Sequence, residues 1–252
     1  MNSTQNLIDT LNHDDGTQRR QAALQLGAVE GAGIADALLT RLRQEPSSCV
    51  REDLTWALVQ HRDEIETDLV DMLGSESAFD RKTAAHVISK VADPRHFEAV
   101  VAVVADADAD VAIKGYRAAA NTGGPAAVPA LASRLGDGEQ LQRDALTSAF
   151  VRIGTPAVPA LVAALTAERV EVREHAADAL GHLGSDADEA ATALEAAAAD
   201  VDAEVRLAAV SALGQLGYAS DDVLKAVAEG DDTGLAAIAR RFLAERETGE
   251  EA

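Results

Sequence analysis

Acidic residues recur along this chain at an almost constant interval, with 30 to 32 residues between neighbouring members of the series. The series runs Asp14, Glu45, Glu76, Asp106, Asp137, Glu168, Asp200 and Asp231. A second series follows five or six residues behind the first and consists of Arg19, Arg51, Arg81, Ala112, Arg143, Arg173 and Arg206. A fixed period of about 20–50 residues is typical of proteins built from stacked structural repeats. The sequence therefore predicts a repeat array rather than a single globular core.

Helical periodicity follows each member of the second series, whose positions we call register positions. Glycine and proline separate these helical segments, as at residues 123–125 (Gly-Gly-Pro) and 154–156 (Gly-Thr-Pro). Glycine suits the residue after a helix C-terminus, and proline suits the first turn of the next helix. Each repeat is thus predicted to contain a first helix, a short acid-containing turn, a second helix that begins near the register position, and a glycine or polar turn.

Both series have a structural explanation. An acid just before the second helix can accept hydrogen bonds from its free N–H groups and interacts favourably with the helix dipole. An arginine on the flank of the apolar face can reach an acid in the adjoining repeat. We expect the two series to hold neighbouring repeats in register.

The order acid, Val-Arg, Ala-Ala, Ala-Leu-Gly-x-Leu-Gly resembles the short HEAT-type repeats of the phycobilin-lyase-like group. It is clearest in the repeats led by Arg173 and Arg206, and the resemblance covers roughly residues 5–245. It implies an all-α fold, a right-handed α-solenoid of about eight two-helix repeats whose second helices line the concave face. We expect a single array over residues 1–246, with a diverged cap at 229–246 and a short acidic tail at 247–252.

Composition limits the cellular setting and the chemistry. Cys49 is the only cysteine, which excludes an internal disulfide and a cysteine cluster for zinc. The sequence shows neither a basic and apolar N-terminal signal nor an apolar run of about 18 residues or more. A cytoplasmic location without membrane attachment is the expectation.

The net charge of −21 comes from 43 acidic and 22 basic residues, of which only four are lysines. Such an excess repels nucleic acid and anionic membranes, so neither is an expected partner. A dispersed, lysine-poor acidic surface resembles that of a cytosolic protein adapted to molar salt. A cationic ligand is the alternative, and both interpretations remain open.

Helix geometry predicts which side chains face the concave surface. Offsets of +2, +5 and +9 from the register position lie about 110° from the centre of the apolar face of the second helix. The candidate binding residues at these offsets are Trp56, Gln60, His86, Lys90, Lys114, Arg117, Asn121, Arg152, His175, Asp178 and His182. Three offsets in each of seven repeats give 21 positions. These positions hold four Lys or Arg residues and two acids, a net charge of +2 in an acidic chain. This pattern predicts a strip that attracts anionic groups, or it is a chance feature of a polar inner face.

Two of these candidates suggest specific roles. Trp56, the only tryptophan, is either an anchor for a partner helix or peptide or a packing residue of the first repeats. His175, Asp178 and His182 have the spacing of metal ligands on one helical face. The two histidines are about 10 Å apart along the helix axis, so an ordinary solvated face is the better explanation and no metal is predicted.

Catalytic relatives with HEAT-like repeats include deoxyhypusine hydroxylase, whose di-iron centre is held by His-Glu pairs just after the register arginine. The present sequence has Glu174-His175, the reverse order, so that ligand set is absent. HEAT-like DNA glycosylases need a basic groove with aromatic residues, and nothing here indicates the pigment pocket of a bilin lyase. We expect a non-catalytic scaffold or adaptor without cofactor that binds a protein or peptide, including an acidic segment, along its concave face. The alternative is a HEAT-like enzyme or enzyme subunit of the bilin-lyase or metal-dependent hydroxylase type. The oligomeric state cannot be read from the sequence.

Overall fold

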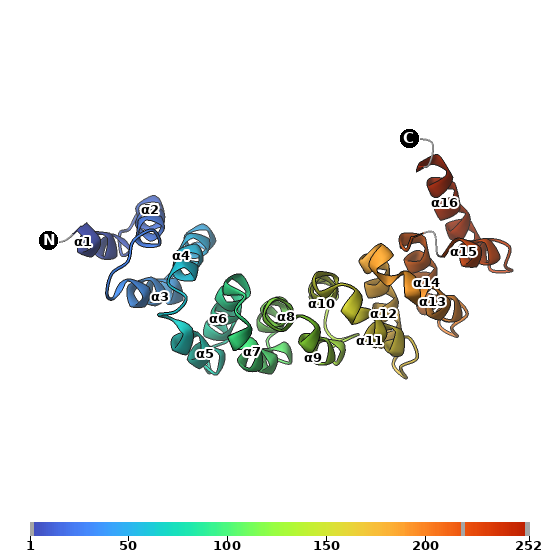
Figure 1. Cartoon of the computed structure of the whole chain (residues 1–252), viewed down its shortest axis with the longest axis horizontal. Coiled ribbons are helices and arrows are strands. Elements are labelled where there is room, and N and C mark those ends of the chain that lie inside the picture. Colours follow the sequence, from blue (N-terminus) through green and yellow to red (C-terminus); the bar gives the residue numbers. More distant parts are fainter. Residues whose placement is uncertain (1–2, 218–219, 250–252) are drawn as a thin grey trace. The chain divides into compact units, whose positions relative to one another are not determined.

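The computed structural model describes residues 3–217 and 220–249, which form sixteen α-helices in eight pairs and contain no strand (Figure 1). The first helices of the pairs are α1 (Ser3–Thr10), α3 (Ile34–Gln44), α5 (Glu66–Leu73), α7 (Phe97–Val104), α9 (Val128–Ala132), α11 (Val158–Ala164), α13 (Ala191–Ala197) and α15 (Asp221–Ala228). The second helices are α2 (Gly16–Leu26), α4 (Ser48–Gln60), α6 (Ala78–Val91), α8 (Ala109–Gly123), α10 (Gln140–Ile153), α12 (Val170–Leu183), α14 (Ala203–Gln215) and α16 (Thr233–Gly249). Short 3-10 turns are η1 (Pro94–His96), η2 (Gly124–Ala127), η3 (Thr155–Ala157) and η4 (Gly184–Ala190). The predicted all-α solenoid class is confirmed.

The chain divides into two compact units, Met1–Thr122 (unit 1) and Gly123–Ala252 (unit 2). The expectations of one continuous array and of a right-handed superhelix stay predictions. Residues 247–249, expected in the acidic tail, belong to α16, and residues 250–252 lie outside the described part of the chain.

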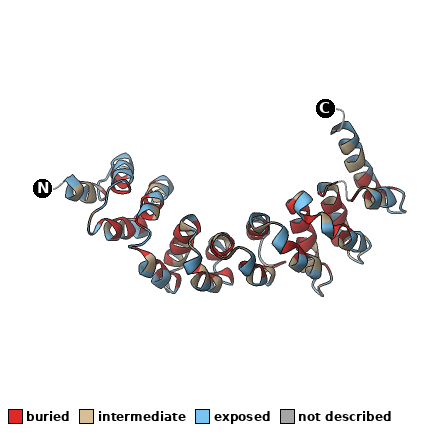
Figure 2. Ribbon diagram, viewed as in Figure 1, coloured by how far each residue is buried: buried red, intermediate tan, exposed pale blue. Residues whose placement is uncertain are grey.

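Within each unit the second helices pack against one another, α2 on α4 and α4 on α6 in unit 1, and α10 on α12, α12 on α14 and α14 on α16 in unit 2. Buried residues lie on the helix sides that face neighbouring helices, and many of them are alanine or leucine (Figure 2). Small residues are needed where backbones approach closely. A Cβ on Gly115 of α8 would lie 2.7 Å from the Val103 carbonyl oxygen of α7, and one on Gly181 of α12 would lie 2.9 Å from Ala212 Cα of α14.

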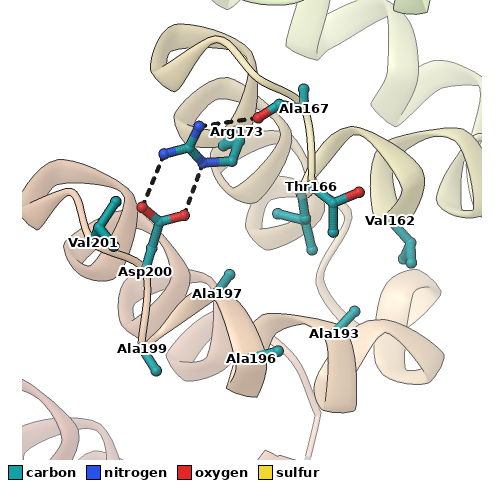
Figure 3. A pocket seen from close by; sticks show the side chains of 11 residues that line it. Val162, Thr166, Ala167, Arg173, Ala193, Ala196, Ala197, Ala199, Asp200 and Val201 are labelled. Carbon is teal, nitrogen blue, oxygen red and sulfur yellow. Dashed lines mark hydrogen bonds and ion pairs between the residues drawn. The ribbon is translucent and has the colours of Figure 1, made fainter.

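Three register arginines make the same set of contacts, which we call the arginine clamp. Arg19, Arg81 and Arg173 each bind both carboxylate oxygens of the acid in the next repeat, at 2.7–2.9 Å. Their remaining terminal nitrogen donates to two carbonyl oxygens five and six residues earlier, at 2.8–3.1 Å. Figure 3 shows the bonds from Arg173 to Asp200 and to the Ala167 carbonyl, beside a cleft of about 590 Å³ whose lining includes five alanines. The expected link between adjoining repeats is therefore present in both units.

The acid of each clamp does not cap the second helix, contrary to the sequence-based expectation. Asp106 and Asp200 accept the backbone N–H of the residue two positions later, at 2.9 and 2.8 Å. The cap itself is that later residue, as at Asp202, which accepts the N–H groups of Glu204 and Val205. In these two repeats the acid of the series fixes the turn, and a second acid, Asp108 or Asp202, begins the helix.

Other register positions keep only part of the clamp. Arg51 and Arg206 donate to the carbonyls five and six residues earlier, and no carboxylate partner of theirs lies in the described residues. Asp137, the acid that follows Ala112 in the series, binds Arg134 and Arg169 of its own unit at 3.0 and 3.1 Å.

Candidate functional site

The exposed face of the second helices lies at offsets +1, +5 and +9 from the register position, and we call it the second-helix surface. Offsets +5 and +9 are exposed or half-buried in all seven repeats that have a register position, as expected. Offset +2 was also expected to be exposed, but Thr83, His175 and Ala208 at this offset are buried. A side chain at +2 points toward the preceding second helix, as His175 of α12 does when it contacts Thr147 of α10. Offset +1 points furthest from the apolar face, and it replaces offset +2 as the third position of the exposed face.

The charge of this surface differs between the two units. In unit 1 it consists of Arg20, Leu24, Ala28, Glu52, Trp56, Gln60, Lys82, His86, Lys90, Ile113, Arg117 and Asn121. In unit 2 it consists of Asp144, Ser148, Arg152, Glu174, Asp178, His182, Leu207, Ser211 and Gln215. Four Lys or Arg residues against one acid give unit 1 a net +3, whereas one arginine against three acids gives unit 2 a net −2. The positive strip expected along the whole chain is therefore a property of unit 1.

Some charges of unit 1 are used between neighbouring helices. Arg20 Nε of α2 donates to Asp53 of α4 at 2.5 Å. Lys82 Nζ of α6 donates to Asp110 of α8 at 2.9 Å. His86 of α6 and Glu52 of α4 are 2.9 Å apart. These pairs link α2, α4, α6 and α8 in sequence and leave little charge there for a ligand.

Three unpaired cations lie on or beside the second-helix surface of unit 1, two at offsets +5 and +9 and one, Lys114, at offset +2. Lys90, Lys114 and Arg117, which we call the cation cluster, form no hydrogen bond or ion pair within the described residues. Lys90 and Arg117 are exposed and Lys114 is half-buried. His86 lies beside them. Loss of hydration lowers its pKa, the charges of Lys114 and Lys90 lower it further, and Glu52 opposes the shift. His86 is therefore neutral at pH 7, and the positive charge belongs to the cluster.

The contact between α6 and α8 near this cluster contains two unpartnered acceptors. The Asn121 amide nitrogen donates to the Ser89 carbonyl at 2.5 Å, while its Oδ1 is buried without a protein partner. Nδ1 of His86 is likewise buried and unpartnered. Buried polar atoms are usually hydrogen-bonded, so these two are exceptions, and because they are buried they are not open to a ligand on the surface.

Trp56 lies on the same surface and is 46% exposed. One edge of its ring rests on Gly27, the residue that follows α2, because a Cβ on Gly27 would lie 2.7 Å from Trp56 Cζ3. The glycine lets the indole lie close to the neighbouring helix while a large part of the ring faces solvent. The ring packs against its own repeats, and its exposed part leaves the role of partner anchor a prediction. Gln60, one turn further along α4, is exposed.

His175 was expected on the exposed face and is buried, 4% exposed. Its Nδ1 accepts the backbone N–H of Gly136 at 3.1 Å, and its Nε2 lies 3.0 Å from Thr147 Oγ1 and 3.2 Å from the Arg143 carbonyl. Burial lowers the pKa of His175 to about 4. The ring is therefore a neutral cross-link between α12, α10 and the turn before α10, and it is not available to a ligand.

Asp178, His182 and Arg152 are exposed, as expected. Asp178 and His182 border a small cavity of about 120 Å³ together with Asp144 and Glu174. Partial loss of hydration and the charge of Glu174 raise the pKa of Asp178. His182 Nδ1 lies 2.9 Å from the Asp178 carbonyl oxygen. Within residues 3–217 and 220–249, no group of three or more His, Cys, Asp or Glu side chains is arranged to hold a metal ion.

No single helix in the described part of the chain is long and apolar enough to cross a membrane. One bent pair, Gln140–Ile153 with Thr155–Ala164, reaches that length and composition jointly and is bent by 117°.

Comparison with known proteins supports the fold. A model of HEAT repeats matches residues 139–214 and 158–244, which together cover less than half of the chain and lie in unit 2. No curated protein matches the sequence. The structure of the karyopherin Kap121p bound to the extreme C-terminus of the protein phosphatase Cdc14p has a TM-score of 0.60 and 12% identity, covering 95% of this chain and 33% of that one. A structure of importin beta has a TM-score of 0.57 and 13% identity, covering 94% of this chain and 41% of that one.

Human deoxyhypusine hydroxylase in complex with glycerol has 20% identity over 97% of this chain and 96% of its own, with a TM-score of only 0.41. The chain spans about a third of Kap121p. Residues 139–244 thus match HEAT repeats, and the chain has the fold of an α-solenoid.

Proposed function

We propose that this chain is a non-catalytic scaffold whose unit 1 binds an acidic segment of a protein partner on its second-helix surface. The observation that carries the proposal is the unpaired cation cluster of Lys90, Lys114 and Arg117 in a chain of net charge −21. The fold supports it, since Kap121p, which is similar in fold, is bound to a C-terminal protein segment in its structure.

The charge of the cluster favours an acidic peptide. A positive strip on an acidic body attracts anions to that strip and repels them elsewhere. Each exposed ion pair contributes only about 0.2–1 kcal/mol, so three together give modest affinity.

A defined peptide tests this proposal. A fluorescein-labelled Glu-Ser peptide is titrated with the full chain in about 0.3 M KCl, which screens long-range repulsion by the other acids. Replacing Lys90, Lys114 and Arg117 together with alanine should weaken binding by about tenfold or more, because three ion pairs of about 0.5 kcal/mol are lost. Lys90 and Arg117 are exposed, Lys114 is half-buried, and none of the three has a partner in the described residues, so the circular dichroism melting curve should change little.

The matched control removes three exposed cations of unit 2, Arg152, Lys225 and Arg241, and changes the net charge by the same amount. Its affinity for the peptide should remain within about threefold of the unaltered chain. Equal losses in both variants would mean that only net charge matters, and an unaltered chain that does not bind the peptide would refute the proposal outright.

A further inference from the structure

Two apolar side chains extend the second-helix surface of unit 1 beyond the cation cluster. Leu24 of α2 and Trp56 of α4 are 41% and 46% exposed, and both occupy offset +5 from their register positions. The two helices are in contact, so these side chains occupy equivalent places on adjoining helices. We call this pair the apolar pair.

The apolar pair and the cation cluster follow one another along the packed helices. The Arg20–Asp53 pair joins α2 to α4, the Glu52–His86 pair joins α4 to α6, and Lys82–Asp110 joins α6 to α8. Apolar surface on α2 and α4 is therefore followed by His86 and Lys90 on α6 and by Lys114 and Arg117 on α8. A ligand that crosses these helices meets apolar surface first and positive charge next.

Helix packing sets the spacing that such a ligand needs. Packed helices lie about 8–10 Å apart, and an extended chain advances about 3.3 Å per residue, so an extended peptide crosses one helix about every three residues. The distance from Trp56 to the cations of α6 and α8 corresponds to about three to six residues of extended chain.

We propose that unit 1 recognises an extended segment in which a bulky apolar residue stands about three residues from the first of several acidic residues. This inference rests on the proposed function and narrows its ligand. The apolar residue lies against Leu24 and the open face of Trp56, and the acidic residues bind the cation cluster. Trp56 is well suited to anchor a ligand because one edge of its ring already rests on Gly27.

The sole tryptophan provides the measurement. Unlabelled Leu-x-x-Glu and Ser-x-x-Glu peptides with the same number of glutamates are titrated while the emission of Trp56 is recorded. The Leu peptide should shift the emission to shorter wavelength and bind about tenfold more tightly than the Ser peptide, because its side chain is partly buried on binding. A third peptide with about nine residues between leucine and glutamate should lose this advantage, since it cannot reach both places without looping out.

Variants separate recognition from stability. Leu24→Ala leaves the tryptophan as reporter and should reduce the preference for the Leu peptide by about threefold or more. Trp56→Ala should abolish the preference, measured with labelled peptides, and Trp56→Phe should restore part of it. Gln60→Ala, an exposed change on the same helix, should leave the preference intact.

The outcomes distinguish this inference from the function on which it rests. Equal binding of the Leu and Ser peptides by the unaltered chain would overturn the apolar pair as a recognition element and leave acidic binding in place. Absence of binding by every acidic peptide would overturn the proposed function as well. A Trp56 emission that shifts with protein concentration alone would show that a second copy of the chain covers this surface, and would also overturn the inference.

Discussion

The two units share their internal contacts and differ in the surface that their second helices present. The same clamp joins Arg19 to Glu45 in unit 1 and Arg173 to Asp200 in unit 2, with nearly equal distances. The second-helix surface is positive in unit 1 and negative in unit 2. The positions that hold repeats together are thus separate from the positions that differ between repeats, and the latter are where recognition can be specified.

The largest expected effect tests whether the clamp stabilises both units equally. Arg19→Ala and Arg173→Ala each leave a mostly buried carboxylate without its main partner, and each should reduce the free energy of unfolding clearly. Arg20→Ala removes an arginine whose side chain is half exposed and should reduce it much less. Urea unfolding at pH 7 gives these values. If a clamp variant were no less stable than Arg20→Ala, the arginine clamp would not contribute to the stability of the fold.

The next effect concerns the buried histidine of unit 2. A histidine whose folded pKa is about 4, below its unfolded value of about 6.5, destabilises the folded state as pH falls through that window. Between pH 6.5 and 5 the unaltered chain should lose about 2 kcal/mol through His175. Carboxylates mostly titrate below this range.

His175→Gln keeps an acceptor and a donor but does not titrate, so its unfolding free energy should vary less with pH by about that amount. His86, whose pKa is also lowered, is common to both proteins and cancels in the difference. Parallel pH profiles for the two proteins would contradict the assignment of His175 as a neutral cross-link.

Salt should act more strongly on unit 2. Unit 1 has 12 basic and 20 acidic residues, a net −8, whereas unit 2 has 10 and 23, a net −13. Repulsion among like charges opposes compaction and is screened when the Debye length falls from about 10 Å at 0.1 M to about 3 Å at 1 M. Raising KCl from about 0.1 to 2 M should therefore raise the melting temperature by roughly 5 °C.

When the salt concentration is raised, the protection of backbone amides against hydrogen exchange should increase more in unit 2 than in unit 1. A flat or falling melting temperature would show that screening of the clamps outweighs relief of repulsion, and it would remove the support for salt adaptation.

The last prediction concerns metal content, where we expect no effect at all. The sequence lacks the His-Glu pairs that a di-iron centre of the deoxyhypusine hydroxylase type would need, so we predict that elemental analysis of the purified chain finds no stoichiometric iron or zinc. One or more tightly held ions per chain would favour the enzymatic alternative over the binding scaffold.

Sequence reasoning identified the repeats, because their period recurs along the chain. It predicted the link between adjoining repeats that Arg19, Arg81 and Arg173 make, but it wrongly expected the acids of these links to cap the second helices. It placed the exposed face less well. A single helix shows which side is apolar, but the position of the neighbouring second helix decides that offset +2 is covered, and His175 was misplaced for this reason. Offset +1, with Glu52 and Lys82, was available from the same geometry and was overlooked. Ion pairs between helices are harder to predict from sequence than exposure is. Only the packed helices show that Lys82 binds Asp110 and that Lys90 has no partner in the described residues.

A reciprocal charge reversal tests the central claim most directly. Lys90, Lys114 and Arg117 are changed together to glutamate, and affinities are measured for matched peptides that carry either glutamates or lysines. The ratio of the two affinities should move toward the lysine peptide by about 100-fold or more, because attraction and repulsion exchange places. The same reversal at Arg152, Lys225 and Arg241 of unit 2 gives an equal change in net charge and should move the ratio by about threefold or less. Equal shifts in the two variants would contradict a specific acidic-peptide site on unit 1.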